Sequence, residues 1–392
     1  MTASTPSAPE PTREPHDAVP RSLVLAAAWS WRILVVAAVA AALVAALRIA
    51  SVVVVPLAVA VLFAALLAPP VRVLTARTPL RRGSASLLVL LVALAAVLVL
   101  FGLVATQLAS GAGTMRASAE SGLEQVVDWL RTGPLKLSSA QLADLIEQAK
   151  QSIRGNSRQL TSGLLSVGTS AGHFVAGLLI ALIGTFFFLA EGEQIWRFFV
   201  RMLPGPAQDP TYEAFRRGWV SLGHYARTQV MVAGVDAIGI GLGALFLRLP
   251  FVIPITVLVF LTSFVPIIGA IVSGAVAVLV ALVVKGPVAA LVMLGVVVLV
   301  QQVETHALQP FLMGRAVALH PLAVIAAVAI GSFLLGIVGA LFAVPVLAVA
   351  NTVVRYYAGQ DPAPELGHEP MPPAERDMVG ESSQEHSGPT DG

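Results

Sequence analysis

Two long apolar segments, residues 252–284 and 321–353, constrain the fold of this chain more than any other feature. Each contains 33 residues. A helix needs about 20 residues to cross a bilayer once, and two crossings need about 40 residues plus a turn. Each segment is therefore too long for one straight span and too short for two complete spans.

Both segments are also interrupted near the middle. Pro266 and Gly269 interrupt the first segment, and Gly336 and Gly339 interrupt the second. Two broken or re-entrant hairpins would fit these lengths if their non-helical tips are buried in protein. Two long, tilted, kinked helices are the alternative. Interrupted segments in corresponding positions are typical of inverted-repeat transporters, so these four residues are candidates for lining a substrate path.

The composition predicts an all-α polytopic membrane protein with about eight membrane segments. Hydrophobic residues make up 57% of the chain and charged residues 12%, against about 45–50% and 25% in soluble proteins. The interrupted segments and the helix between them account for three membrane segments. Five simple spans are expected at residues 33–47, 49–68, 85–108, 171–190 and 228–247.

Arginines at the span ends predict the orientation of the chain. They cluster in the loop after the second span and in the connector before the fifth, and such clusters favour the cytoplasmic side. Both termini are then cytoplasmic, in a bacterial inner membrane. The expected parts are a disordered tail (1–21), spans one to three (22–109), an extracytoplasmic insert (110–170), span four with a cytoplasmic connector (171–227), a transport core (228–357) and a second disordered cytoplasmic tail (358–392).

The insert at 110–170 predicts two amphipathic helices. Apolar residues recur at helical spacing over 123–130 and again over 142–153, and the intervening positions are too polar for a membrane span. The helices could form a lid or a surface for a partner protein. Alternatively, they rest on the membrane or pack against a second subunit, which would make the protein a homo-oligomer.

Several classes of function are excluded by the sequence. The chain has no cysteine, so disulfides, thiol nucleophiles and thiolate metal sites are absent. It contains neither a G-x-x-x-x-G-K-[ST] phosphate loop nor an H-E-x-x-H motif. We find no catalytic residues, no metal site and no cofactor site, and the basic residues form no stripe that would bind nucleic acid. The sequence therefore predicts a protein that is not an enzyme, with the lipid bilayer and a small polar solute or a monovalent cation as its partners.

Two carboxylates stand out in the transport core. Asp236 lies near the middle of the fifth span, where a charged aspartate costs about 2.5–3.5 kcal/mol on insertion scales. Glu304 lies at the end of the helix before the second interrupted segment. Each could couple transport to an ion. The alternatives are a hydrogen-bonded structural aspartate and an ordinary interfacial glutamate.

The run at 301–321, QQVETHALQPFLMGRAVALHP, is the most polar short stretch of the C-terminal half. A polar, proline-broken run between membrane-length segments usually lines a cavity, and a simple loop is the alternative. The further substrate-path candidates in this run are Gln301, Gln302, His306, Gln309, Pro310, Arg315 and His320.

This run resembles the signature of the AI-2E transporter family, through QQ-x-E, then M-G-[KR], then HP. The resemblance extends to FVPIIGAIVSG and GIVGALFAVPVLAV and covers roughly residues 20–357. It departs at His306, where the family pattern has asparagine. The resemblance implies a secondary transporter that exports a small polar solute such as autoinducer-2. Sodium(lithium)/proton antiport is an alternative, and a membrane scaffold that transports nothing is another.

Overall fold

The computed structural model is α-helical and contains no β-strand in the part of the chain it describes. The described residues are 21–132, 172, 174–265, 268–308 and 320–371. Within them, seven helices are long and apolar enough to cross a membrane. The prediction of an all-α polytopic membrane protein is therefore confirmed. The chain divides into two compact units, residues 1–51 and 52–392.

The first unit contains helix α1 (Arg21–Ile49). Trp29 and Trp31 are exposed near its N-terminal end, as expected of tryptophans at a membrane interface. Arg48 lies in the last turn, where a cation is favoured by the helix dipole. The sequence had predicted a division between two spans at this residue, and the break falls there.

The second unit begins with three helices that share an apolar core: α2 (Ser51–Arg77), the start of α3 (Arg82–Thr132) and the helix Phe174–Val200. Their shared core contains Ala64, Ala85 and Leu189. The backbone oxygen of Leu189 also accepts a hydrogen bond of 3.0 Å from Arg82 Nε.

Helix α3 continues through the boundary that the sequence predicted between the third span and the insert. The helix contains 51 residues, so the first part of the insert extends the third span without a break. The second expected amphipathic helix, at 142–153, lies outside the described residues.

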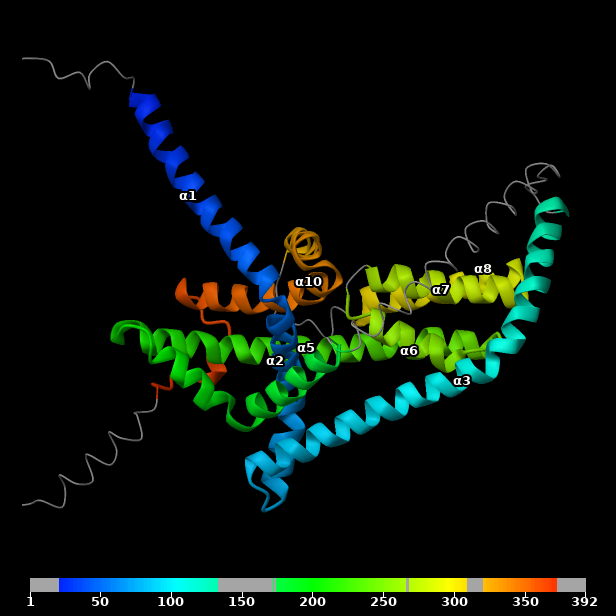
Figure 1. Ribbon diagram of the computed structural model, residues 1–392, viewed down its shortest axis with the longest axis horizontal. Coiled ribbons are helices and arrows are strands. Elements are labelled where there is room, and N and C mark those ends of the chain that lie inside the picture. The colour runs from blue at the N-terminus through cyan, green and yellow to red at the C-terminus, as the bar shows by residue number, and fades with distance from the viewer. Residues whose placement is uncertain (1–20, 133–171, 173, 266–267, 309–319, 372–392) are drawn as a thin grey trace, which may run out of the picture. The chain divides into compact units, whose positions relative to one another are not determined.

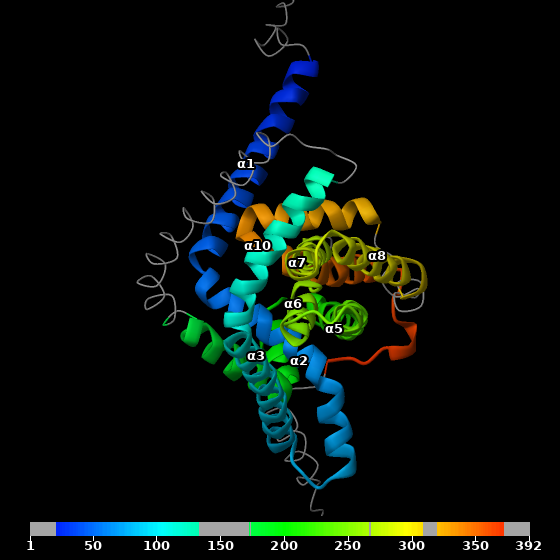
Figure 2. The same cartoon turned by 90° about the vertical axis from the view of Figure 1, so that its right-hand side faces the viewer.

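Helix α5 (Gly205–Phe246) connects the other helices of the second unit. It packs against α6, α8 and α10, and Figure 1 shows α5, α6, α7 and α8 running side by side. Figure 2 views α5, α6 and α7 nearly end-on. Gly239 and Gly243 permit this packing, because a Cβ atom at either would lie 2.6 or 2.5 Å from a valine side chain of α8.

The first interrupted segment forms a helical hairpin of α6 (Val252–Thr262) and α7 (Ile268–Lys285). The 11 residues of α6 span about 16 Å, which is too short to cross a bilayer. At the break, a Cβ atom on Gly269 would lie 1.9 Å from the backbone oxygen of Thr262. Only glycine permits this approach of the two backbones.

The second interrupted segment, α10 (Pro321–Tyr357), is also broken. Leu335 and Gly336 have non-helical backbone angles, and Gly336 has φ 62°, a left-handed conformation that favours glycine. A Cβ atom on Gly339 would lie 1.9 Å from the backbone oxygen of Gly331. The two halves of α10 therefore turn back on each other, as the hairpin interpretation of the sequence requires.

The chain after α10 turns back onto the first half of α5. Thr211 Oγ1 and Tyr357 Oη are 2.9 Å apart, and Arg217 donates two hydrogen bonds of 2.7 Å to the carboxylate of Asp361. The sequence predicted a disordered tail from residue 358, whereas residues 358–371 follow a defined path. Ion pairs hold this polar segment in place, and a local apolar pattern does not reveal them.

Candidate functional site

A buried carboxylate lies where α5 passes the break of the first hairpin. The side chain of Asp236 is buried, with 3% of its surface exposed. Its Oδ2 accepts a hydrogen bond of 3.1 Å from Ser263 Oγ. Its Oδ1 is also buried and has no hydrogen-bond partner within the described residues. Asp236 is thus a polar group with half of its hydrogen-bonding capacity unused.

The break itself supplies the other polar atoms of this site. Ser263 is the C-cap of α6, so its carbonyl lies among the last carbonyls of the helix, which lack an intrahelical partner. Gln229 Nε2 donates a hydrogen bond of 2.8 Å to this carbonyl. Gln229 and Asp236 are seven residues apart and share one face of α5. One face of α5 therefore satisfies both the hydroxyl and the carbonyl of Ser263.

Glu304 belongs to the same region. It opens a short π-helical turn, η2 (Glu304–Leu308), directly after α8 (Pro287–Val303). Turns of this kind occur frequently at functional sites. The turn contacts α5, and Glu304 is close enough to Asp236 for the two carboxylates to interact electrostatically. The structure thus brings together the two carboxylates that the sequence singled out.

The second hairpin reaches the same stretch of α5. Tyr225 of α5 is buried in a cluster with Val328, Ala340 and Val344 from the two halves of α10. Val265, from the break of the first hairpin, packs against this cluster. Both hairpins therefore pack along α5, the first beside Asp236 and the second around Tyr225.

The other candidates from the polar run have more ordinary surroundings. Gln301 is half-buried, whereas Gln302 and His306 are exposed. His306 Nδ1 lies 3.2 Å from the backbone oxygen of Gln302. His320 is the N-cap of α10, and its Nδ1 accepts a hydrogen bond of 3.2 Å from the backbone nitrogen of Leu322. The geometry gives both histidines a local structural contact.

Four further candidates, Pro266, Gln309, Pro310 and Arg315, lie outside the described residues. Gly269, Gly336 and Gly339 lie at the two hairpin breaks. Their part in a substrate path stays a prediction. Among the residues that the structure describes, no group of three or more His, Asp or Glu side chains could hold a metal ion.

Sequence reasoning missed Gln229 and Ser263. Neither is charged, so neither stands out in a hydrophobic segment. The available signal was positional: Gln229 lies two helical turns before Asp236, and Ser263 directly precedes the proline-containing interruption. A search for neutral polar residues beside each interruption would have found Ser263, and a search along the helical face that carries Asp236 would have found Gln229.

Comparisons with known proteins place this chain among transport proteins. A family model described as AI-2E family transporter matches residues 33–359. The "Putative transport protein MT0215" of Mycobacterium tuberculosis (strain CDC 1551 / Oshkosh) is 39% identical over 86% of this chain and 91% of its own length. The "AI-2 transport protein TqsA" of Escherichia coli (strain K12) is 26% identical over 80% of this chain and 88% of its own.

Proposed function

The chain belongs to the AI-2E transporter family, a family of membrane transport proteins, and we propose that it is a secondary transporter with Asp236 and Glu304 at its central site. The proposed cargo is a small polar solute of the autoinducer-2 type, which is exported from the cell. The name of the Escherichia coli relative supports this class of cargo. The observation that carries the proposal is the buried Asp236 carboxylate beside a broken helix.

The geometry supports ion coupling at Asp236. An ionisable side chain within a membrane segment is costly, and such residues generally mark ion or substrate pathways. Within the described residues, Asp236 has one hydrogen bond and one buried oxygen without a hydrogen-bond partner. That oxygen can take a proton or a cation, while Ser263 holds the other oxygen. Backbone groups at the hairpin breaks add acceptors and donors for a polar solute.

Sodium(lithium)/proton antiport is a second candidate, and the proximity of Asp236 and Glu304 favours it. Two neighbouring carboxylates can exchange a proton for a monovalent cation without a further charged group. The two candidates share a site and differ in cargo. A single reconstituted preparation can therefore separate them.

The test uses purified full-length protein in proteoliposomes that contain a pH-sensitive dye. Solute export predicts movement of autoinducer-2 together with a pH change, and antiport predicts a pH change on addition of Na⁺ or Li⁺ without any solute. In either case, Asp236→Asn should abolish the coupled flux, because asparagine carries no charge and cannot take up or release a proton. Asp209→Asn is the matched control, because Asp209 is exposed on the same helix. Wild-type flux in Asp236→Asn would overturn the proposal.

The proposed orientation places both termini in the cytoplasm and both hairpins within the bilayer. Because the chain has no cysteine, single cysteines at Lys285 and Arg315 can be probed with a membrane-impermeant thiol reagent in intact cells. We expect labelling at Lys285 from outside and protection at Arg315 until the membrane is opened. The opposite pattern would mean that the interrupted segments cross the membrane completely.

A further inference from the structure

A second site lies at the arginine-rich end of the helices, away from Asp236. A cavity of about 730 Å³ lies between α2, the start of α3, the helix Phe174–Val200 and the first half of α5. Its volume falls within the range of about 300–1,000 Å³ that is usual for small-molecule sites. None of the polar residues of the Asp236 site lines it. The cavity is therefore a separate feature of the second unit.

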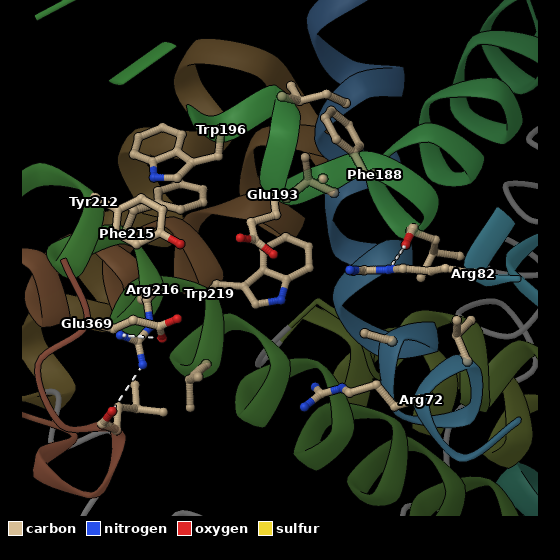
Figure 3. A pocket seen from close by; sticks show the side chains of 18 of the residues that line it. Arg72, Arg82, Phe188, Glu193, Trp196, Tyr212, Phe215, Arg216, Trp219 and Glu369 are labelled. Carbon is tan, nitrogen blue, oxygen red and sulfur yellow. Dashed lines mark hydrogen bonds and ion pairs between the residues drawn. The ribbon is translucent and has the colours of Figure 1, made fainter. Parts of the chain in front are cut away.

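One side of the cavity is aromatic (Figure 3). Trp196 and Phe215 are stacked, with ring centroids 3.6 Å apart and an angle of 16° between the planes. Tyr212 and Trp219 add two further rings to the lining. The Trp196 Nε1 atom is buried and has no hydrogen-bond partner among the described residues. Buried donors are normally paired, so this atom is suited to an acceptor on a bound molecule.

The opposite side of the cavity carries two arginines with unused hydrogen-bonding capacity (Figure 3). Arg82 donates through Nε to the backbone oxygen of Leu189 at 3.0 Å, and its terminal nitrogens make no hydrogen bond or ion pair within the described residues. Arg72 is exposed, and its guanidinium makes no hydrogen bond or ion pair within the described residues. Guanidinium groups match phosphate and carboxylate oxygens in geometry as well as charge.

The other charged residues of the lining determine the orientation in which an anionic ligand could bind. Arg216 is already paired with Glu213 at 2.8 Å and with Glu369 at 3.1 Å. Glu193 lines the cavity close enough to Tyr212 to interact with it electrostatically, and its Oε1 is 4.0 Å from Arg197 Nε. Its carboxylate would repel an anionic group at the aromatic side. An anionic group is therefore favoured only at the side with Arg72 and Arg82.

We propose that this cavity binds an amphipathic anion. Its phosphate or carboxylate group contacts Arg72 and Arg82, and its apolar body packs against the aromatic side. Basic pockets between membrane helices on the cytoplasmic side can bind anionic lipid headgroups, and a soluble alkyl phosphate has the same chemistry. The two sources share one binding mode and differ in where the ligand comes from.

The experiment measures tryptophan fluorescence of the full-length protein. The chain has five tryptophans, and substitution of Trp29, Trp31 and Trp129 by phenylalanine leaves only the two that line the cavity. In nonionic detergent, dodecyl phosphate should change this fluorescence with a saturable binding curve. In nanodiscs, brominated anionic phospholipid should quench it more strongly than brominated phosphatidylcholine if the occupant is a lipid. Saturation by dodecyl phosphate without quenching by the brominated anionic lipid would assign a soluble occupant.

The variants decide whether the arginines hold the ligand. Arg72→Gln is the primary variant, because this side chain makes no hydrogen bond or ion pair within the described residues whose loss would disturb the fold. We expect it to weaken dodecyl phosphate binding several-fold, and the Arg72→Gln/Arg82→Gln double variant to weaken it by about tenfold or more. Arg77→Gln, on the same helix but outside the lining, should bind normally, as should Asp236→Asn. A lack of saturable binding, or equal affinity in the wild type and the double variant, would overturn the proposal.

Discussion

Two buried carboxylates on the same helix differ in the number of hydrogen bonds and ion pairs that they make. Glu213 and Asp236 both lie on α5, and their exposed fractions are 0% and 3%. Glu213 accepts hydrogen bonds from Arg216, from Arg217 and from the backbone nitrogen of Glu369. Asp236 accepts only the hydrogen bond from Ser263 among the described residues. The two carboxylates are therefore about equally buried, but only Glu213 has several hydrogen-bond donors that offset the cost of burying its charge.

This difference suits Glu213 to a structural role and Asp236 to ion coupling. A buried charge is costly unless it is paired and hydrogen-bonded. Glu213 meets this condition through Arg217, which also pairs with Asp361 and lies 4.5 Å from the centre of the Tyr356 ring. That cluster ties α5 to the C-terminal segment. Asp236 is left undercompensated beside a broken helix, which suits a group that exchanges a proton or a cation.

The largest expected effect on stability is at Glu213. Glu213→Gln would leave Arg217, which is 3% exposed, without one of its two carboxylate partners. Breaking a buried pair by removing one partner typically costs about 3–5 kcal/mol. We expect a large drop in the thermal unfolding temperature in detergent, with unchanged transport per folded molecule. Glu365→Gln is the control, since Glu365 is exposed, and it should leave the unfolding temperature unchanged. An equally mild effect of both substitutions would remove the contrast with Asp236.

The next effect tests whether the two halves of α10 pack closely against each other. Gly339→Ala places a Cβ atom 1.9 Å from the backbone oxygen of Gly331, and a backbone contact cannot move aside as a flexible side chain can. Overpacking of this kind costs about 1–3 kcal/mol. Gly172→Ala is the matched control, because no atom lies within 4 Å of the added Cβ. If Gly339→Ala unfolds at the wild-type temperature, the two halves of α10 are not in close contact.

A smaller effect is expected from pH. The hydrogen bonds from Arg217 hold the pKa of Asp361 below its usual value of 3.8. A lowered pKa in the folded state means that this carboxylate stabilises the fold above about pH 3.8 and that the contribution is lost as the pH falls through the lowered pKa. Asp361 is partly exposed, so we expect less than about 1 kcal/mol. The unfolding temperature of Asp361→Asn should depend less on pH between 2 and 5 than that of the wild type, and parallel curves would contradict the assignment.

Much of the fold follows from local features of the sequence. Hydropathy identifies the spans, and the lengths of 252–284 and 321–353 together with their glycines indicate broken hairpins. The intramembrane charge identifies Asp236. These signals work because length, hydropathy and backbone freedom are properties of short stretches of chain.

Contacts between distant segments could not be predicted in this way. Arg217 and Asp361 are 144 residues apart, and nothing in either local pattern indicates that they pair. The same holds for the hydrogen bond between Gln229 and the carbonyl of Ser263, and for the cavity, which is assembled from four helices and the C-terminal segment. A polar, proline-rich composition at 358–371 indicates disorder only when the charged partners elsewhere in the chain are ignored.

The smallest expected effect on stability is at Asp236, where the effect on transport is expected to be largest. Asparagine has nearly the same shape as aspartate and keeps an oxygen that can accept the hydrogen bond from Ser263. Asp236→Asn removes the need to bury a carboxylate, so the free energy of unfolding should stay within about 0.5 kcal/mol of the wild type or rise. Thermal unfolding of Asp236→Asn and Glu213→Gln, measured side by side with flux, checks this. If Asp236→Asn lowers stability as much as Glu213→Gln does, Asp236 is a structural residue like Glu213, and the coupling site must be sought at Glu304.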